Sequence, residues 1–204
     1  MPGAAAIKAD IAAARATLER MEADAALHAA AAEAAQLVLR ALRRGGKLLL
    51  CGNGGSAADA QHWAAELVSR FHFDRPGLAA IALTVDSSAL TGIGNDYGYE
   101  RVFSRQVEAL GRAGDVLFGL STSGRSPNVL RAMEAARGLG MATVGFTGAG
   151  PGAAGLAAVS DVLVQVPSTA TPAIQEGHEV LGHAICAMVE REMFPPPPSQ
   201  PPAA

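Results

Sequence analysis

The pair of residues most able to do chemistry is His62 and Glu66, which lie four residues apart in an alanine-rich stretch. On a helix, a spacing of four stacks two side chains on one face, so both can reach the same atom. An imidazole and a carboxylate placed in this way can bind a metal ion or move protons. Because buried charges are costly unless they are paired or bound to metal, their place on a largely apolar helix favours a functional role.

A glycine-rich turn at residues 52–56 stands directly before this helix and follows the apolar run 47–51. Glycines allow a tight turn and bring backbone N–H groups close to a ligand, and the first turn of the next helix adds unpaired donors. These features favour an anion-binding turn.

The same turn matches the dinucleotide-binding pattern GxGxxA, which is weak when it stands alone. That pattern needs an acidic residue at the end of the second strand to hold a ribose. Asp74 precedes the expected second strand, and Asp86 lies too far along the chain. A nicotinamide enzyme is therefore disfavoured.

A second candidate anion site follows the apolar segment 116–120 and has the sequence STSGRSP. Four of its first six residues carry hydroxyl groups, namely Ser121, Thr122, Ser123 and Ser126. Hydroxyls offer many hydrogen-bond donors to one small anion. Ser126 would also cap a helix opened by Pro127, but capping does not account for the other three. We therefore expect this loop to hold a phosphate group and the glycine turn to orient the rest of the substrate.

Polar residues also gather on an apolar segment near the end of the chain, at Gln175, Glu176, Glu179 and His183. His183 lies one helical turn beyond Glu179 and two turns beyond Glu176, so spacing alone leaves its partner open. Gln175 and His183 are separated by eight residues, which is a rise of about 12 Å along a straight helix. Either Gln175 precedes the regular helix, or these groups converge from different subunits.

A further candidate contact lies in the glycine-rich segment 92–98, which we expect to form a loop. Asn95 and Asp96 could offer an amide and a carboxylate from this loop to sugar hydroxyls. A plain turn explains the same two residues, so both interpretations stay open.

The elements that must position these groups alternate along the chain. Short apolar runs without polar alternation predict strands at 47–51, 79–84, 115–120, 141–147 and 161–166. Helices are expected at 56–70, about 100–110, 127–138 and about 173–193. This order predicts an α/β fold with a five-stranded, parallel, doubly wound sheet of the flavodoxin-like kind, flanked by helices. Ligands of such sheets bind outside the carboxyl ends of the strands, where the glycine and hydroxyl loops both lie.

Two helices are expected before the first strand, over residues 4 to about 44. Because no strand separates them, they cannot belong to a βαβ unit and must pack on something else, such as a partner subunit. We expect one domain over residues 1–194 that includes these helices. The proline-rich segment 195–204 is expected to be a disordered or polyproline tail.

Composition excludes several classes of function. The 16 basic and 19 acidic residues among 204 give a net charge of −3 without a basic block, which argues against a nucleic-acid partner. The chain has no run of 18 apolar residues and no signal-peptide pattern at its start. We therefore expect no membrane partner and a cytoplasmic protein.

Taken together, the segments 52–56, 121–124 and 175–178 resemble those of the sugar isomerase (SIS) domain family. His62, Glu66 and His183 make the chain similar to the phosphoheptose isomerase branch of that family, from about residue 5 to residue 193. The resemblance implies conversion of sedoheptulose 7-phosphate to D-glycero-D-manno-heptose 7-phosphate through an enediol. This would be the first step of nucleotide-activated heptose biosynthesis, with Glu66 and His183 as the acid–base pair.

The resemblance also implies a homotetramer with active sites at subunit interfaces and one zinc ion per subunit. The zinc ligands that it implies are His62, Glu66, Gln175 and His183. The substrate contacts that it implies are Asn53, Gly54, Gly55, Ser56, Glu66, Asn95, Asp96, Ser121, Thr122, Ser123, Ser126 and Gln175. A carboxylate that is bound to zinc is a poorer base, so ligation by Glu66 competes with proton transfer. The chain departs from some relatives at Ala170 and Pro172, in a stretch where those relatives have an acidic residue.

Two non-catalytic functions are alternatives on the same fold. One is an SIS-type protein that binds the bacterial replication initiator, and the other is a domain that senses a sugar phosphate without turnover. An initiator-binding protein would lack the acid–base pair. The presence of Glu66 and His183 therefore argues against that role.

Overall fold

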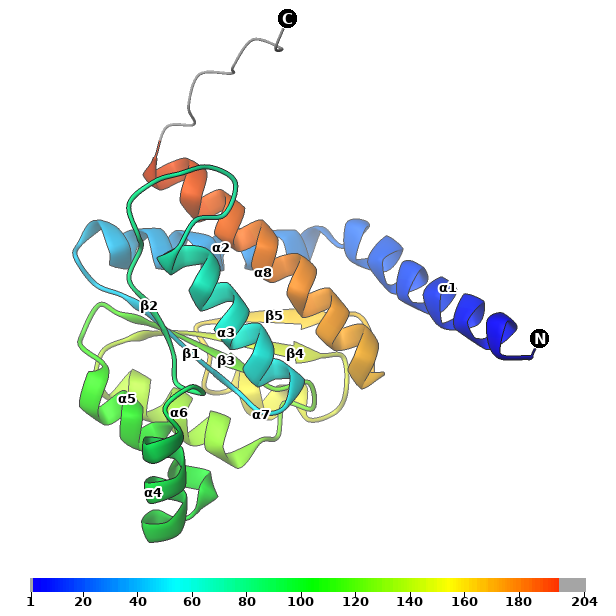
Figure 1. Cartoon of the computed structure of the whole chain (residues 1–204). Helices are drawn as coiled ribbons and strands as arrows, with labels where there is room; N and C mark the ends of the chain where they lie inside the picture. Colours follow the sequence, from blue (N-terminus) through cyan, green and yellow to red (C-terminus); the bar gives the residue numbers. More distant parts are fainter. Residues whose placement is uncertain (1, 195–204) are drawn as a thin grey trace, which may run out of the picture.

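The computed structural model describes residues 2–194, which form a five-stranded, all-parallel sheet with helices on both faces (Figure 1). The strands are β1 (Leu48–Gly52), β2 (Ala80–Ala82), β3 (Val116–Leu120), β4 (Ala142–Gly148) and β5 (Val162–Val166). Their order across the sheet is β2-β1-β3-β4-β5. The predicted α/β, doubly wound, flavodoxin-like fold is confirmed. The proline-rich segment 195–204 lies outside the described residues, as does Met1.

Both faces of the sheet are buried under helices. On β1, Leu48 and Leu50 belong to one apolar cluster, whereas Leu49 and Cys51 belong to the cluster on the other face. The first cluster is covered by α2 (Ala25–Arg43), α3 (Gly55–Val68) and α8 (Thr171–Met193). The second is covered by α5 (Ser104–Leu110), α6 (Pro127–Gly138) and the short α7 (Ala153–Ala157). Burial on both faces explains why the strands are continuous apolar runs in the sequence.

The neighbouring strands β1 and β3 connect to helices on opposite faces of the sheet. β1 and β3 are paired along their length, with Gly52 opposite Leu120. After β1 the chain continues into α3 on one face, and after β3 it continues into α6 on the other. The glycine turn and the hydroxyl loop therefore leave the sheet side by side, where a doubly wound fold binds its ligands.

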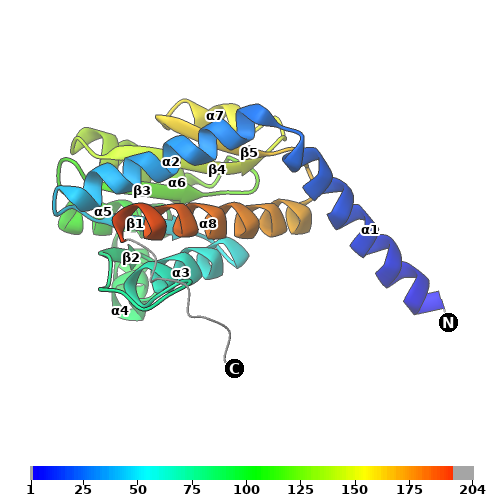
Figure 2. The same ribbon diagram turned by 90° about the horizontal axis from the view of Figure 1, so that it is seen from above.

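The two helices predicted before the first strand are present, and they differ in where they lie. α2 lies along the sheet beside α8, whereas α1 (Pro2–Glu22) extends away from the body of the molecule (Figures 1 and 2). Asp24 separates them and caps α2, because its Oδ1 accepts two backbone N–H groups of that helix at 3.0 Å. Ile7 and Ile11 on α1 are 63% and 65% exposed. None of the helices within residues 2–194 is long and apolar enough to cross a membrane.

The segment 92–98, predicted as a loop, belongs mostly to a helix, α4 (Ser87–Tyr97), so that prediction was wrong. The helix begins at Asp86, whose Oδ1 accepts the N–H of Ala89 at 2.9 Å, and it ends at Gly98 with φ 87°. The cap at Asp86 outweighs the low helical propensity of the glycines inside α4. A single 3₁₀ turn, η1 (Tyr99–Arg101), links α4 to α5. The predicted helix at about 100–110 thus starts later than expected, and α7 was not predicted.

A buried ion pair fixes the carboxyl-terminal ends of α3 and α8 to each other. Arg75 Nε lies 3.1 Å from Glu190 Oε1, with side chains that are 2% and 0% exposed. The carboxylate also accepts the backbone N–H groups of Phe71 and His72, and Arg75 donates to the carbonyl of Leu67 near the end of α3. Burial by itself raises the pKa of Glu190, but the hydrogen bonds from His72, Phe71 and Arg75 outweigh burial and lower it.

Candidate active site

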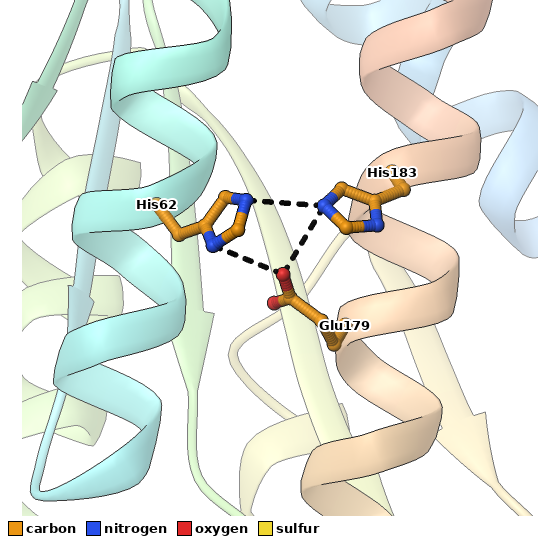
Figure 3. Close-up of side chains that lie close together, drawn as sticks. All are labelled: His62, Glu179 and His183. Atoms are coloured by element: carbon orange, nitrogen blue, oxygen red, sulfur yellow. Dashed lines mark hydrogen bonds and ion pairs between the residues drawn. The ribbon is translucent and has the colours of Figure 1, made fainter.

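Helix α8 brings Glu179 and His183 to His62 of α3 (Figure 3). His62 Nε2 lies 3.1 Å from Glu66 Oε1 and 3.1 Å from His183 Nε2. Glu179 Oε1 lies 3.2 Å from His62 Nδ1 and 3.2 Å from His183 Nε2. The partner of His183, which spacing left open between Glu176 and Glu179, is therefore Glu179.

α3 and α8 can approach closely because Gly182 has no side chain. A Cβ at this position would lie within 2.5 Å of three atoms of the Trp63 indole. Trp63 is 1% exposed, and its Nε1 donates to Glu179 Oε2 at 3.0 Å. The indole thus fills the space between the helices and orients the Glu179 carboxylate, with Oε1 toward the histidines. The sequence did not predict the roles of Trp63 and Gly182. The position of the single tryptophan, three residues before Glu66, was a signal for the first of them.

The donor set of this cluster fits a metal ion. Ligand atoms of His62, Glu179 and His183 all lie within 4.8 Å of one another. Imidazole nitrogen and carboxylate oxygen are common zinc ligands. The neighbouring Asp59 Oδ2 is buried without a hydrogen-bond partner among the described residues. Burial and the charge of Glu179 raise the pKa of Asp59 to about 6, whereas His62 acts in the opposite direction. A cation would offset this excess of negative charge.

Gln175 lies within the regular part of α8, so the alternative that it precedes the helix was wrong. Its side-chain amide packs against the first turn of α3, because a Cβ on Gly55 would lie within 2.5 Å of Gln175 Nε2. Two helical turns, a rise of about 12 Å, separate its backbone from that of His183. The amide therefore lies beside the glycine turn.

The hydroxyl loop after β3 presents a preformed group of donors. Ser121 is buried, and its Oγ lies 2.9 Å from Ser126 Oγ. Ser126 occupies the N-cap position of α6, as predicted, but its side chain makes no capping hydrogen bond. Its hydroxyl is turned instead toward Ser121 in the loop, at the start of α6, where the N–H groups of Val129 and Leu130 donate to the Ser126 carbonyl. The N-terminal end of a helix carries a partial positive charge, which favours an anion.

An amide pair joins the glycine turn to the hydroxyl loop. Asn53 Nδ2 donates to Asn128 Oδ1 at 2.9 Å, and Asn128 Nδ2 donates to Asn53 Oδ1 at 2.8 Å. The Tyr99 hydroxyl donates to the same oxygen of Asn53 at 3.2 Å. A cavity of about 200 Å³ adjoins this pair, lined by Asn53, Tyr99, Glu100, Ser126, Pro127 and Asn128. Sequence reasoning identified Asn53 and Ser126 but missed Tyr99 and Asn128.

The remaining predicted contacts, Asn95 and Asp96, lie on the last turn of α4. Both are exposed, and Asn95 Nδ2 donates to Asp96 Oδ1 at 2.7 Å. Within one subunit they contact each other, while the neighbouring η1 reaches Asn53 through Tyr99. Their contact with a substrate stays a prediction.

Comparison with known proteins agrees with the fold. Residues 11–148 match the model of the SIS domain family. The chain is 56% identical over 184 residues to phosphoheptose isomerase of Burkholderia pseudomallei (strain 1710b), which covers 90% of this chain and 92% of the relative. A solved phosphoheptose isomerase structure from Neisseria gonorrhoeae has a TM-score of 0.83 at 48% identity, covering 90% of this chain and 96% of that one. One from Francisella tularensis has a TM-score of 0.88 at 38% identity, with coverage of 94% and 100%.

A parallel doubly wound sheet with histidine and glutamate side chains clustered between α3 and α8, matched over most of its length by these proteins, defines an isomerase of sugar phosphates. The chain belongs to the SIS domain family and, within it, to the phosphoheptose isomerases. It is therefore an enzyme, an aldose–ketose isomerase, which decides against the non-catalytic alternatives.

Proposed function

We propose that the enzyme converts sedoheptulose 7-phosphate to D-glycero-D-manno-heptose 7-phosphate, as the first step of nucleotide-activated heptose biosynthesis in the cytoplasm. The observation that carries the proposal is that Glu66 and His183 both contact the imidazole of His62. Both catalytic groups lie 3.1 Å from Nε2 of the same imidazole. The names of the relatives support a heptose phosphate as the substrate.

The reaction moves one proton between two carbons and one proton between two oxygens. Glu66, whose side chain is 25% exposed, takes the proton from the carbon next to the carbonyl and returns it to the neighbouring carbon of the enediol. His183 carries the proton between the two oxygens. A partly exposed carboxylate suits the first transfer because a substrate carbon can reach its lone pairs, and an imidazole suits the second because it can both donate and accept a proton.

Two loops hold the substrate in this proposal. The hydroxyls of the 121–126 loop bind the phosphate at the N-terminal end of α6, where Ser121 and Ser126 already lie within hydrogen-bond distance of each other. The glycine turn and Gln175 contact the sugar. The amide pair of Asn53 and Asn128 keeps the two loops at a fixed separation.

One zinc ion per subunit is part of the proposed site. His62 and His183 would bind it together with neighbouring side chains, and the resemblance assigns Glu66 and Gln175 as the remaining ligands. When bound, the ion polarises a sugar oxygen as a Lewis acid. The fit of the donor set and the unpaired buried oxygen of Asp59 support a cation here.

A homotetramer with active sites at subunit interfaces is also proposed. The projecting α1 supports it, because this helix exposes Ile7 and Ile11 away from the body of the subunit (Figure 2). An apolar groove of about 230 Å³ lies between α2 and α8, lined by His28, Ala31, Ala32, Leu181, Ala184, Ile185 and Met188. Sedimentation analysis tests this proposal, and a fully active monomer would contradict it.

The reaction itself is tested in deuterated water with sedoheptulose 7-phosphate, by NMR detection of deuterium at the carbon next to the carbonyl. Glu66→Gln should reduce the exchange rate by about 10²- to 10⁴-fold, the usual contribution of a general base. Glu176→Gln makes the same chemical change on an exposed residue of α8 and should leave the rate unchanged. Exchange at the wild-type rate in the Glu66→Gln protein would show that Glu66 is not the base.

A further inference from the structure

We propose that Asn128 is a positioning residue for substrate binding: it fixes the side-chain amide of Asn53, so that Asn53 offers the substrate one N–H donor and no acceptor. This role rests on the proposed function, because the amide pair joins the two loops that hold the sugar phosphate. The hydrogen bonds around Asn128 and Asn53 determine the orientation of both amides.

The orientation of the Asn128 amide is determined by a backbone group. The N–H of Val129, which the Ser126 carbonyl shares, donates to the Asn128 side chain at 3.0 Å. A backbone N–H can only donate, so the side-chain atom that it meets must be the amide oxygen. Asn128 is 3% exposed, which keeps water away from these contacts. The nitrogen of the Asn128 amide therefore faces Asn53.

The orientation of the Asn53 amide follows from that of Asn128. Asn128 Nδ2 donates at 2.8 Å, so the atom that it meets is the oxygen of Asn53, and Asn53 Nδ2 donates back to Asn128 Oδ1 at 2.9 Å. The Tyr99 hydroxyl donates to the same oxygen of Asn53 at 3.2 Å. Both lone pairs of this oxygen are thus engaged. One of the two N–H bonds of Asn53 Nδ2 has no acceptor among residues 2–194.

The free N–H of Asn53 selects an acceptor oxygen. Asn53 and Ser126 line the same cavity of about 200 Å³, so an oxygen in this cavity can reach the N–H. Phosphate oxygens and sugar hydroxyls both accept hydrogen bonds from an amide. With the opposite orientation, Asn53 would present its own oxygen, which repels a phosphate group. Asn128 therefore sets the kind of atom that the glycine turn binds.

Asn128→Asp tests the amide pair, because its effect depends on pH. A protonated carboxyl group reproduces the amide, since its O–H donates to Asn53 and its carbonyl oxygen accepts from Asn53. An ionised carboxylate has no donor and turns a second oxygen toward the oxygen of Asn53. Burial raises the pKa of a carboxyl group at this position. Glu100 is the only charged residue that lines the cavity, and it is paired with Arg131 at 2.8 Å. The pair should therefore form at about pH 6 and break at about pH 9.

Phosphorus NMR titrations measure the affinities for sedoheptulose 7-phosphate and for inorganic phosphate, each relative to the wild type at the same pH. At the higher pH, Asn128→Asp should weaken the binding of the sugar phosphate by about 10- to 100-fold if the acceptor is a phosphate oxygen. Inorganic phosphate should then lose a similar factor. A loss of about 3- to 10-fold for the sugar phosphate alone would assign the acceptor to a sugar hydroxyl. At the lower pH the affinity should return to that of the wild type.

Gln106→Glu is the matched control, because it also changes a buried amide to an acid, on α5, and Gln106 does not line the cavity. It should bind both compounds as the wild type does. If Asn128→Asp fails to fold, Tyr99→Phe on an exposed residue frees one lone pair of the Asn53 oxygen and should weaken binding by about 2- to 5-fold. Unchanged binding in Tyr99→Phe would then overturn the inference.

Two results with Asn128→Asp would overturn the inference directly: wild-type affinity at both pH values, or the same loss at both. Deuterium exchange is measured on the same preparations. Wild type that binds the sugar phosphate with the expected response of Asn128→Asp, but catalyses no exchange, would refute the proposed function alone. Wild type that catalyses exchange while Asn128→Asp binds normally would refute this inference alone, and wild type that binds neither compound would refute both.

Discussion

Gly182→Ala tests whether the close packing of α3 on α8 builds the active site. The added methyl group would lie within 2.5 Å of three atoms of Trp63, whereas ordinary contact begins at 3.4 Å. Trp63 is buried and cannot turn aside, so the two helices must separate by about 1 Å. The hydrogen bond from Trp63 to Glu179, now 3.0 Å, would then exceed the usual range.

The expected cost combines two opposing effects. Overpacking a buried site costs about 1–3 kcal/mol, and an overlap with three ring atoms belongs at the upper end. Alanine gains about 1 kcal/mol over glycine in a helix interior. We therefore expect Gly182→Ala to lower the free energy of unfolding by about 1–2 kcal/mol, although alanine is the better helix former.

Urea unfolding followed by Trp63 fluorescence measures this change. Gly138→Ala is the matched control, because Gly138 also lies in a helix, α6, but a Cβ there has no neighbour within 4 Å. It should raise the free energy of unfolding by up to about 1 kcal/mol. If Gly182→Ala proved as stable as the Gly138→Ala protein, the role of Gly182 in the approach of the two helices would be refuted.

The remaining predictions concern the two ends of the same helix pair. Glu190→Gln leaves the buried Arg75 guanidinium unpaired and should cost about 3–5 kcal/mol in urea unfolding. The exposed Glu192→Gln should cost less than about 1 kcal/mol, and equal losses would contradict the argument. Because the pKa of Glu190 is lowered below 4.5 on folding, the carboxylate stabilises the fold above that pH. This stability should be lost as the pH falls through the lowered pKa, and Glu190→Gln should flatten that part of the pH profile. Gly55→Ala should displace the Gln175 amide and raise KM without unfolding the protein, and an unchanged KM would exclude Gln175 from substrate binding.

The strands and most helices could be predicted because each depends on a local pattern. The strands are buried on both faces, so they stand out as apolar runs, and Pro127 marks the start of α6 at the predicted residue. α4 was missed because its glycines suggest a loop, and only the Asp86 cap indicates a helix. The expectations of a single domain and of a disordered or polyproline tail at 195–204 stay predictions.

The candidate site could be predicted in its parts but not in its assembly. His62, Glu66 and His183 stood out as polar groups on apolar helices. The choice of Glu179 over Glu176 depends on which face of α8 meets α3, and contacts between positions 121 residues apart are not encoded in spacing. The contact between Trp63 and Gly182 determines which face of α8 meets α3. Neither residue indicates this contact in the sequence by itself.

The two halves of the site are far apart in the sequence, which affects how the site forms while the chain is being synthesised. α3 is complete before residue 70, whereas Glu179 and His183 lie on α8, the last helix of the described chain. A ribosome adds about 5–20 residues per second, so α3 is exposed for several seconds before α8 exists. During this interval His62 and Glu66 lack their partners and remain hydrated. A chain that stops before α8 would therefore carry half of the acid–base residues and neither the metal cluster nor the activity.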